Sequence, residues 1–358
     1  MKKTLSLIIP CYNEEATLEK CIGEVMQLAD ERLALEVIIV DDCSTDRSLE
    51  IARRAAAQYS EIKIFQHEAN QGKGAALRTG FMKATGDYVG IQDADNEYNP
   101  LDYKKLLVPM ADGRADVVYG SRYLRPETRK VLYFWHTQMN RFLTFVSNMF
   151  TNLGVTDMET CYKLFRREVI QEIAPKLREN RFGFEPEVTA HIAEAGCRVY
   201  ECAISYNPRT YEEGKKIGWK DGIRALYCIL HYGGHRAPIP MQLIIYFCIG
   251  LICAIVNIVI FSFLFETVSL FFATSLAFLI AAALNYLLCI LILFRHKARW
   301  TSIGEIAAYF LAISIMLAFD YVCTAGMIHL GMEPNSAKLA ATVLGFIGNF
   351  LLRKFLVF

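Results

Sequence analysis

Two aspartates separated by one residue, Asp93 and Asp95, form the most chemically suggestive pattern in this sequence of 358 residues. They stand in the run DADNEY, directly after a short apolar segment. Carboxylate oxygens are hard ligands that suit Mg²⁺ or Mn²⁺, whereas a soft metal would take Cys or His. The eleven cysteines show no CxxC pair and no zinc spacing. The pair therefore predicts a divalent ion that holds a diphosphate.

Further polar residues follow two earlier apolar runs. In an open α/β sheet, ligands bind beyond the carboxyl ends of the strands, so acids that follow three separate strands should meet in one crevice. Any one of them alone is more simply a turn residue or a helix cap, as Ser44 or Thr45 would be for the helix after IVDD. As a set they predict a site, and the residues at the first two ends are Tyr12, Asn13, Glu14, Asp41 and Asp42.

A glycine-rich segment, NQGKGAALRTG, places Lys73 where a helix should begin. No GxGxxG or GxxxxGK[ST] motif occurs in the chain, which argues against the usual dinucleotide and P-loop sites. A loop of this kind lets the backbone approach a nucleotide closely while its basic residue meets phosphate. The alternative is a simple turn with a solvated lysine.

These residues need a scaffold, and the first part of the chain alternates short apolar runs with helical patterns. The order β-α-β-α-β-α-β predicts an α/β domain with an open, mostly parallel, Rossmann-like sheet. Strands are expected at 4–10, 35–42, 63–68 and 87–95, and helices at about 15–30, 47–59 and 73–84.

The last third of the chain is hydrophobic in four runs, each about long enough to cross a hydrocarbon core of about 30 Å as a helix. These runs are 241–265, 269–294, 303–330 and 337–358. Lys and Arg gather in the link RHKARW and near the end of the last run, whereas the loop 266–269 has neither. We therefore expect an integral membrane protein with four spans, and the first domain and the C-terminus in the cytoplasm. The start MKKTLSLIIP is too short an apolar run for a signal peptide and is interpreted as a strand.

Two stretches between these parts, VLYFWHTQMNRFLTFVSNMF and KKIGWKDGIRALYCILHY, mix aromatic residues with Lys and Arg. That composition is typical of helices that lie in the lipid headgroup layer. As core helices they would bury Arg141 and Arg224 at high cost. The predicted organisation is an α/β domain over 1–212, an interfacial helix and linker over 213–240, and an all-α transmembrane domain over 241–358.

A set of strings resembles family 2 glycosyltransferases of the GT-A fold, and more narrowly the polyprenyl- and dolichyl-phosphate sugar synthases. The strings, in chain order, are IIPCYNEE, VIIVDDCSTDRS, NQGKGAALRTGF, IQDADNEYNP and ADVVYGSRY. The likeness covers about residues 4 to 232, and the hydrophobic part resembles the GtrA family of four-span proteins.

This resemblance implies where the donor and its metal bind. The nucleotide sugar is expected at Pro10, Tyr12, Glu14, Asp42, Lys73, Asp93 and Ala94. The metal, Mg²⁺ or Mn²⁺, is expected at Asp93, Asp95 and Glu97. Many relatives have Gln at the last of these positions, which weakens its assignment as a ligand.

The acceptor side follows from the chemistry of a lipid phosphate, which is already an anion and needs no general base to attack the anomeric carbon. Cations that position it matter more, and guanidinium forks match phosphate oxygens. We expect a lipid-phosphate site at Arg122, Arg141 and Arg209, each of which would otherwise be a surface charge.

The expected catalytic residues are Asp95, Arg122, Arg209 and Asp157. In TDMETCYKLF, Asp157 and Glu159 lie close to where relatives carry acceptor-side residues. Asp157 is about equally well explained as a helix cap. FGFEPEVTA adds Glu185 and Glu187, and these acids could orient sugar hydroxyls.

The predicted activity is transfer of a hexose onto undecaprenyl or dolichyl phosphate with inversion, because one crevice with one metal site offers no second nucleophile. UDP-glucose is the expected donor, since NRFGFEPEVTA and RTYEEGKKIGW resemble the glucosyl-type branch, and GDP-mannose is the alternative. A processive polysaccharide synthase would need QxxRW, and HKARW differs in its first residue and follows two spans.

A non-catalytic membrane scaffold or lipid-sugar flippase is the alternative from another class of protein. The intact Asp-x-Asp and the lysine loop argue against it. The expected partners are the nucleotide sugar, the lipid phosphate and the membrane, with no nucleic acid, and a homo-oligomer is left open.

Overall fold

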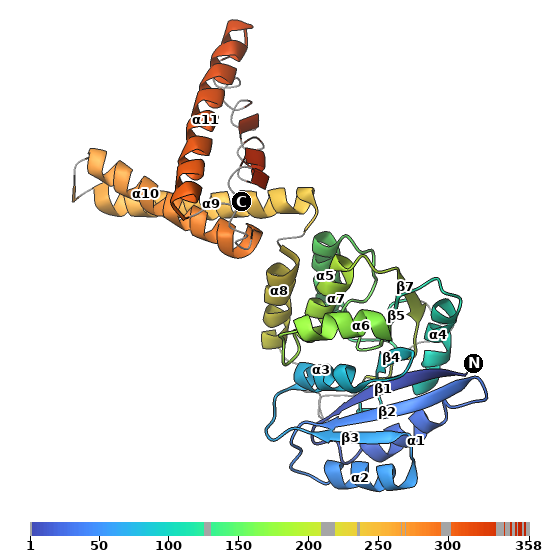
Figure 1. Ribbon diagram of the computed structural model, residues 1–358. Coiled ribbons are helices and arrows are strands. Elements are labelled where there is room, and N and C mark those ends of the chain that lie inside the picture. Colours follow the sequence, from blue (N-terminus) through green and yellow to red (C-terminus); the bar gives the residue numbers. More distant parts are fainter. Residues whose placement is uncertain are drawn as a thin grey trace. The chain divides into compact units, whose positions relative to one another are not determined.

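The computed structural model describes residues 2–124, 130–208, 219–234, 237–265, 267–268, 270–294 and 302–333, together with 340, 344–345, 348, 350–352 and 354–355. The chain divides into two compact units, Met1–Arg236 and Ala237–Phe358, and each has its own fold (Figure 1). The division lies inside the segment 213–240 that the sequence marks as an interfacial helix and linker.

The first unit is built on a seven-stranded sheet with the strand order β3-β2-β1-β4-β6-β5-β7. All neighbouring strands are parallel except at β6, which runs antiparallel to both β4 and β5. The mostly parallel sheet expected from the sequence is therefore confirmed. The strands are β1 (Lys3–Cys11), β2 (Leu33–Asp41), β3 (Ile62–Gln66), β4 (Tyr88–Ile91), β5 (Val117–Ser121), β6 (Lys163–Arg166) and β7 (Val199–Ala203).

Helices cover both faces of this sheet, which explains why β1 and β2 are continuous apolar runs. Leu7 and Ile9 face one cluster of buried side chains, and Ile8 faces the other. The first cluster includes α1 (Leu18–Met26), α2 (Ser48–Gln58) and α4 (Tyr103–Ala111), the last preceded by the short η1 (Pro100–Asp102). The second includes α3 (Lys73–Lys83), α6 (Arg167–Ile173) with η2 (Ala174–Lys176), and α7 (Phe184–Glu194).

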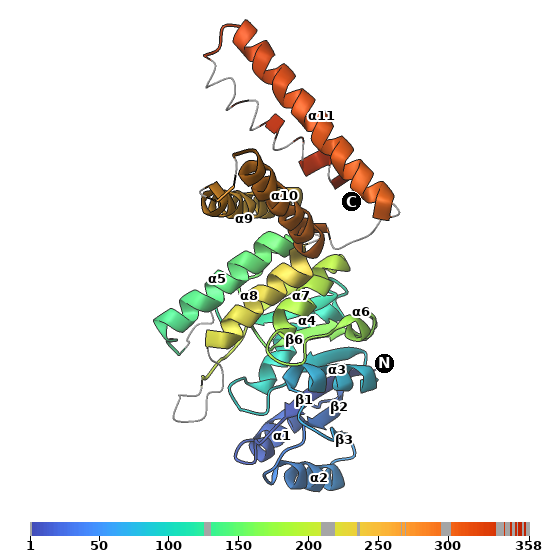
Figure 2. The same ribbon diagram turned by 90° about the vertical axis from the view of Figure 1, so that its left-hand side faces the viewer.

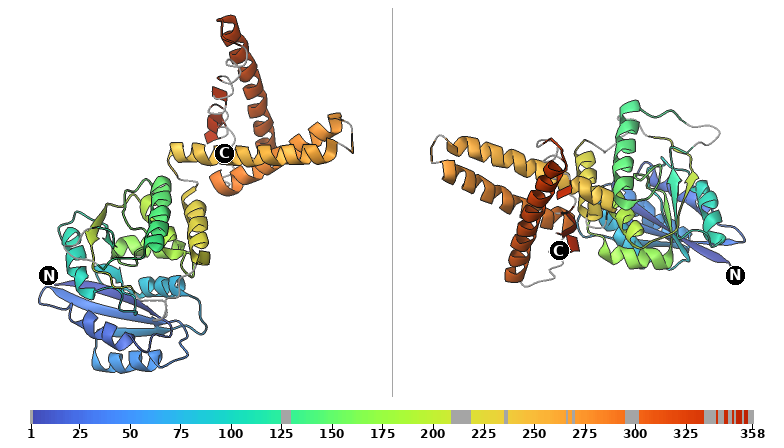
Figure 3. Two further views of the ribbon diagram at one scale, coloured as in Figure 1. Left: turned by 180° about the vertical axis from the view of Figure 1, so that it is seen from behind. Right: turned by 90° about the horizontal axis from the view of Figure 1, so that it is seen from above.

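Two more helices, α5 (Phe134–Thr151) and α8 (Trp219–Gly233), lie side by side and both pack on α7 (Figures 2 and 3). Gly233 lies directly against Phe150, where a Cβ would come within 2.9 Å of the aromatic side chain. Large apolar side chains of both helices remain exposed, and Trp135 is 81% exposed. The others include Phe134, Met139, Phe142, Phe145, Ile223 and Tyr227.

The loop after β2 corrects one expectation, because neither Ser44 nor Thr45 caps the next helix. Helix α2 begins at Ser48, whose N–H donates to Asp46 Oδ1 at 2.9 Å. Ser44 and Thr45 instead bind Asn13 of the preceding strand-end loop, through Asn13 N–H to Ser44 Oγ and Thr45 N–H to Asn13 Oδ1. These polar residues join two loops at the carboxyl edge of the sheet.

The second unit contains α9 (Ile239–Phe265), α10 (Leu270–Leu288), the π-helical turn η4 (Cys289–Phe294) and α11 (Ser302–His329). Helices α9 and α10 pack against each other. Within the ranges given above, one helix, Ile239–Leu264, is long and apolar enough to cross a membrane. The four spans remain a prediction, and the link 295–300 and most of the expected fourth span lie outside those ranges.

Candidate active site

Three residues other than glycine adopt a left-handed backbone at the three strand ends that the sequence marks as a site. Asn13 follows β1 with φ 55°, Cys43 follows β2 with φ 62°, and Asn96 follows β4 with φ 58°. Such conformations are uncommon and concentrate at functional sites. Of the four such residues among those described, three therefore lie at the edge that carries the acidic residues, and the fourth, Asn152, ends α5.

Asp42 is buried and organises the glycine-rich loop. Its Oδ1 accepts from Gln71 N–H at 2.9 Å, and its Oδ2 accepts from Gly72 N–H at 2.7 Å. His67 Nδ1 lies 2.7 Å from Oδ1. The preceding Asp41, predicted at this strand end but not among the expected nucleotide-sugar contacts, has a buried Oδ1 with no hydrogen-bond partner among the residues that the structure describes. Asp42 therefore shapes the loop, while Asp41 retains acceptor capacity.

Lys73 stands at the first position of α3 and reaches the turn after β4. Its Nζ lies 2.8 Å from Asp93 Oδ1, 2.8 Å from Cys161 Sγ and 3.8 Å from Glu185 Oε1. Burial alone would lower the pKa of Lys73, but the carboxylate charges of Asp93 and Glu185 outweigh it and raise the pKa well above its usual range. The side chain is therefore a permanent ammonium at the end of the sheet, as phosphate binding requires.

Asp95 and Glu97 lie in the turn after β4 and are both partly exposed. Asp95 Oδ1 accepts from Glu97 N–H at 3.1 Å, and Glu97 Oε2 accepts from Tyr206 Oη at 2.8 Å. Asp93, the third predicted ligand, is held by Lys73. In the part of the chain with assigned positions, no three His, Cys, Asp or Glu side chains gather into a metal site. Partly exposed carboxylates still fit Mg²⁺ or Mn²⁺, which commonly take one or two carboxylates and complete their shell with substrate phosphates and water.

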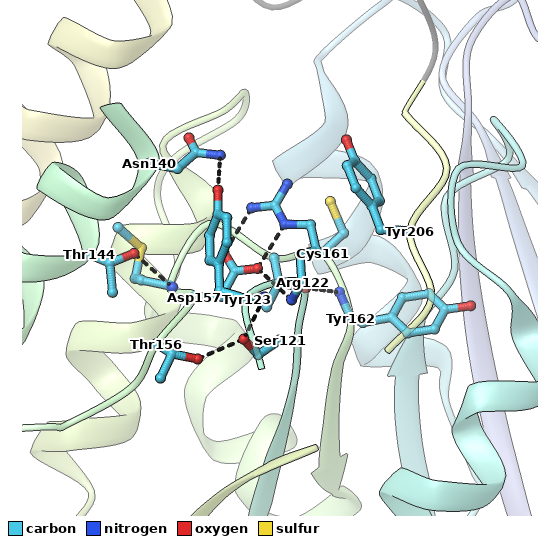
Figure 4. A network of polar contacts seen from close by, with 12 residues as sticks. Ser121, Arg122, Tyr123, Asn140, Thr144, Thr156, Asp157, Cys161, Tyr162 and Tyr206 are labelled. Carbon is cyan, nitrogen blue, oxygen red and sulfur yellow. Dashed lines mark hydrogen bonds and ion pairs between the residues drawn. The ribbon is translucent and has the colours of Figure 1, made fainter. Parts of the chain in front are cut away.

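Arg122 and Asp157 form a buried, bidentate ion pair (Figure 4). Arg122 Nε donates to Asp157 Oδ2 at 2.7 Å, and Nη2 donates to Oδ1 at 2.8 Å. The backbone N–H of Arg122 also donates to Oδ2 at 3.0 Å. Asp157 therefore fixes the orientation of Arg122, and the structure gives it this role in place of a helix cap.

Tyr123 stands between two of the predicted phosphate-binding arginines. The guanidinium carbon of Arg122 lies 5.8 Å from its ring centre, and that of Arg141, on α5, lies 5.6 Å from it. Arg122 also lies 5.1 Å from the ring of Tyr206. The structure thus brings Arg122 and Arg141 to one aromatic residue, while Arg209 falls outside the residues that the structure describes.

The loop from Asp157 to Tyr162 links the partner of Arg122, which is Asp157, to a neighbour of Lys73, which is Cys161. Buried Lys163 donates to the carbonyls of Met158 and Thr160, on either side of Glu159. Oε1 of Glu159 is buried and lacks a hydrogen-bond partner within the described chain. Burial and the neighbouring charge of Glu185 raise the pKa of Glu159 to about 8. Lys163 was missed at the sequence level, where a lysine in a short strand gives no sign of where its amine will lie.

The remaining predicted donor residues all lie at the same edge of the sheet. Pro10 is in β1, and Tyr12 follows it with its side chain 39% exposed. Glu14 N–H donates to Ser48 Oγ at 2.8 Å, and Ala94 is buried between the two aspartates of the Asp-x-Asp pair. Their contact with a nucleotide remains a prediction.

Two family models match this chain. Residues 6–174 match the glycosyl transferase family 2, and residues 245–358 match the GtrA/DPMS transmembrane domain. A dolichyl-phosphate beta-glucosyltransferase of Trichomonas vaginalis is 27% identical over 217 residues, covering 57% of this chain and 65% of the relative. Glycosyltransferase AglD of Haloferax volcanii is 26% identical over 214 residues, covering 57% of this chain and 33% of the relative. The chain thus spans less than two thirds of the length of these relatives.

Solved structures show a similar fold. Glucosyl-3-phosphoglycerate synthase from Mycobacterium tuberculosis, in complex with Mn²⁺, UDP and glucosyl-3-phosphoglycerate, aligns with a TM-score of 0.50 and 18% identity. The alignment covers 66% of this chain and 81% of that one. Together with the family model, this likeness confirms the GT-A, Rossmann-like mixed sheet.

Proposed function

This chain carries a glycosyl transferase family 2 domain followed by a GtrA/DPMS transmembrane domain, and on that premise we propose that it transfers glucose from UDP-glucose to a polyprenyl phosphate. The observation that carries the proposal is the pairing of Lys73 with Asp93 at the carboxyl edge of the sheet. The same folding unit exposes the aromatic face of α5 and α8, which suits a lipid acceptor. Relatives named as dolichyl-phosphate beta-glucosyltransferases support glucose over mannose.

On the donor side, we assign the diphosphate to Lys73 and the nucleotide base to the ends of β1 and β2. Asp95 and Glu97, with Asp93, would hold Mg²⁺ or Mn²⁺, which neutralises the charge of the leaving diphosphate when bound. The Mn²⁺ and UDP in the solved synthase are consistent with this assignment.

On the acceptor side, the lipid phosphate attacks the anomeric carbon directly, and the arginines position it. Asp157 occupies the Nε and Nη2 edge of Arg122, so phosphate binding would use Nη1 together with Arg141 and Arg209. Glu159, neutral below about pH 8, avoids adding negative charge beside the incoming phosphate. A single displacement of this kind inverts the anomeric centre, so an α-linked donor gives a β-linked lipid sugar.

The membrane arrangement follows the same proposal. The exposed face of α5 and α8 lies in the headgroup layer, and four spans place the GT-A domain and the C-terminus in the cytoplasm, where nucleotide sugars are available. The GtrA/DPMS match over 245–358 and the apolar helix Ile239–Leu264 support membrane insertion.

A donor screen tests the proposed function. The full chain, purified in lipid, is incubated with a polyprenyl phosphate and UDP- or GDP-linked glucose, mannose or galactose, and sugar transfer to the lipid is counted. Selective turnover of UDP-glucose is expected. Selective turnover of GDP-mannose would refute the donor assignment, and no turnover of any donor would favour a non-catalytic scaffold.

A further inference from the structure

Helix α8 holds one buried carboxylate of the GT-A domain, that of Glu179. Arg224 Nε lies 3.1 Å from Glu179 Oε2, and Arg224 Nη2 lies 2.8 Å from Oε1. Tyr232, two turns further along the same helix, donates its hydroxyl to Oε1 at 3.2 Å. Glu179 is buried, whereas the Arg224 side chain is 54% exposed. A helix at the edge of the unit thus determines where this carboxylate lies.

The backbone around Glu179 lies directly against the glycine-rich loop. Ala75 N–H donates to Asn180 O at 3.2 Å. A Cβ added at Gly72 would overlap Asn180 O, and one added at Gly74 would overlap Glu179 O. Glycine is therefore required on both sides of Lys73 by the closeness of residues 179 and 180, and at Gly72 also by its φ of 98°.

Residues 177–180 also bind α7 and α3. Because α3 begins at Lys73, a shift of Glu179 would be passed to the glycine-rich loop. Glu187 accepts from the N–H groups of Arg178 and Glu179 at 2.7 and 2.8 Å. Arg78, on α3, donates to Leu177 O and Asn180 Oδ1 at 3.2 and 2.9 Å. The path from α8 to the loop consists of packed backbone and charged hydrogen bonds, without a flexible side chain between residues 179–180 and Gly72 or Gly74.

We propose that Arg224 and Glu179 are positioning residues for the donor diphosphate: the ion pair fixes residues 179–180, which fix the two glycines beside Lys73. The proposal rests on the assignment of Lys73 to the diphosphate in the proposed function. Helix α8, which carries part of the exposed lipid-facing surface, is by this account also a structural part of the nucleotide site. Loss of Arg224 leaves a buried carboxylate with less compensation, and the segment that carries it shifts.

The test compares Arg224→Gln with a matched control, Arg198→Gln. Arg198 makes a similar bidentate pair with Asp116, at 2.9 and 2.7 Å, and its side chain is 57% exposed. Asp116 directly precedes β5 and Arg198 directly precedes β7, so this pair lies at the opposite edge of the sheet from Lys73. Binding of UDP and of GDP in Mn²⁺ is measured by calorimetry on the full chain in lipid, and KM is measured separately for donor and for lipid phosphate.

We expect Arg224→Gln to weaken nucleotide binding and raise the donor KM by about three- to tenfold, with the lipid-phosphate KM unchanged. Arg224→Lys should recover part of the loss, and Arg198→Gln should bind the nucleotide as the unchanged chain does. Equal nucleotide affinity in Arg224→Gln and Arg198→Gln would overturn the inference while leaving the proposed function intact. If the unchanged chain bound neither nucleotide, the proposed function and this inference would fall together.

Discussion

Asp157 binds the guanidinium of Arg122 with both oxygens of its carboxylate, at N–O distances of 2.7 and 2.8 Å, and neither side chain is appreciably exposed. Breaking such a pair by removing one partner leaves an uncompensated buried charge and costs about 3–5 kcal/mol. Arg122→Ala should therefore lower the melting temperature as well as weaken use of the lipid phosphate. Arg122→Lys keeps the charge but loses the fork, so it should recover only part of either property.

Thermal unfolding and acceptor kinetics of these variants, together with Asp157→Asn, check this prediction. Asp157→Asn should reduce acceptor use although Asp157 itself is assigned no contact with the phosphate, because it orients Arg122. An Arg122→Ala enzyme with unchanged melting temperature and unchanged dependence on lipid-phosphate concentration would contradict the role of the pair.

Replacement of Lys73 should act on the donor. Lys73→Met removes the cation that lies 2.8 Å from Asp93 and leaves that carboxylate to repel the diphosphate. We expect UDP affinity to fall by at least about tenfold, as loss of a charge-assisted contact implies, with a smaller change in lipid-phosphate KM. Lys20→Ala, which removes an exposed lysine paired with Glu24 on α1, serves as control. A Lys73→Met protein that binds UDP normally would remove the lysine from the site.

Glu159 predicts a pH dependence of turnover. Burial and the charge of Glu185 raise its pKa to about 8, although Lys163 and Arg122 act in the opposite direction and Asp157 adds to the rise. The carboxyl is neutral below this pH and becomes an anion above it. Turnover should therefore fall as pH rises through about 8, and Glu159→Gln, which stays neutral, should not show that limb. The measurement is the pH–rate profile of the unchanged chain and of Glu159→Gln. If turnover fell in the same way at alkaline pH in both proteins, Glu159 would be excluded as the cause.

Asp95→Asn should abolish metal-dependent activity while the protein stays folded and in the membrane. The side chain is partly exposed in a turn, so it contributes charge to a ligand more than packing to the core. Titration of turnover with Mg²⁺ and Mn²⁺, alongside a circular dichroism spectrum, measures both properties. Retention of most turnover in either metal would remove Asp95 from the metal site.

Much of the sheet was predictable because its strands are buried on both faces and read as continuous apolar runs, as β1 and β2 do. The strand-end residues followed from the same order, since parallel strands present their carboxyl ends at one edge. The bond between Asn13 and Thr45 shows the limit of local patterns: a residue suited to cap a helix instead joins two loops 32 residues apart in sequence.

The contacts that were not predictable join segments distant in sequence. Arg122 was expected to bind phosphate, but Asp157 occupies one edge of its guanidinium, from a loop 35 residues away. Arg224 was recognised as too costly to bury within a core helix, and it is indeed half exposed, yet its partner Glu179 lies 45 residues away. Such pairs depend on how helices pack over the sheet, which spacing along the chain does not encode.

The anomeric configuration of the lipid product tests the central claim most directly. The full chain in lipid is given UDP-glucose labelled with ¹³C at the anomeric carbon and a polyprenyl phosphate, and the extracted lipid is examined by mass spectrometry and NMR. The account predicts a single glucose linked to the lipid phosphate in the β configuration, formed together with UDP. An α-linked product, or hydrolysis of UDP-glucose with no sugar on the lipid, would contradict it.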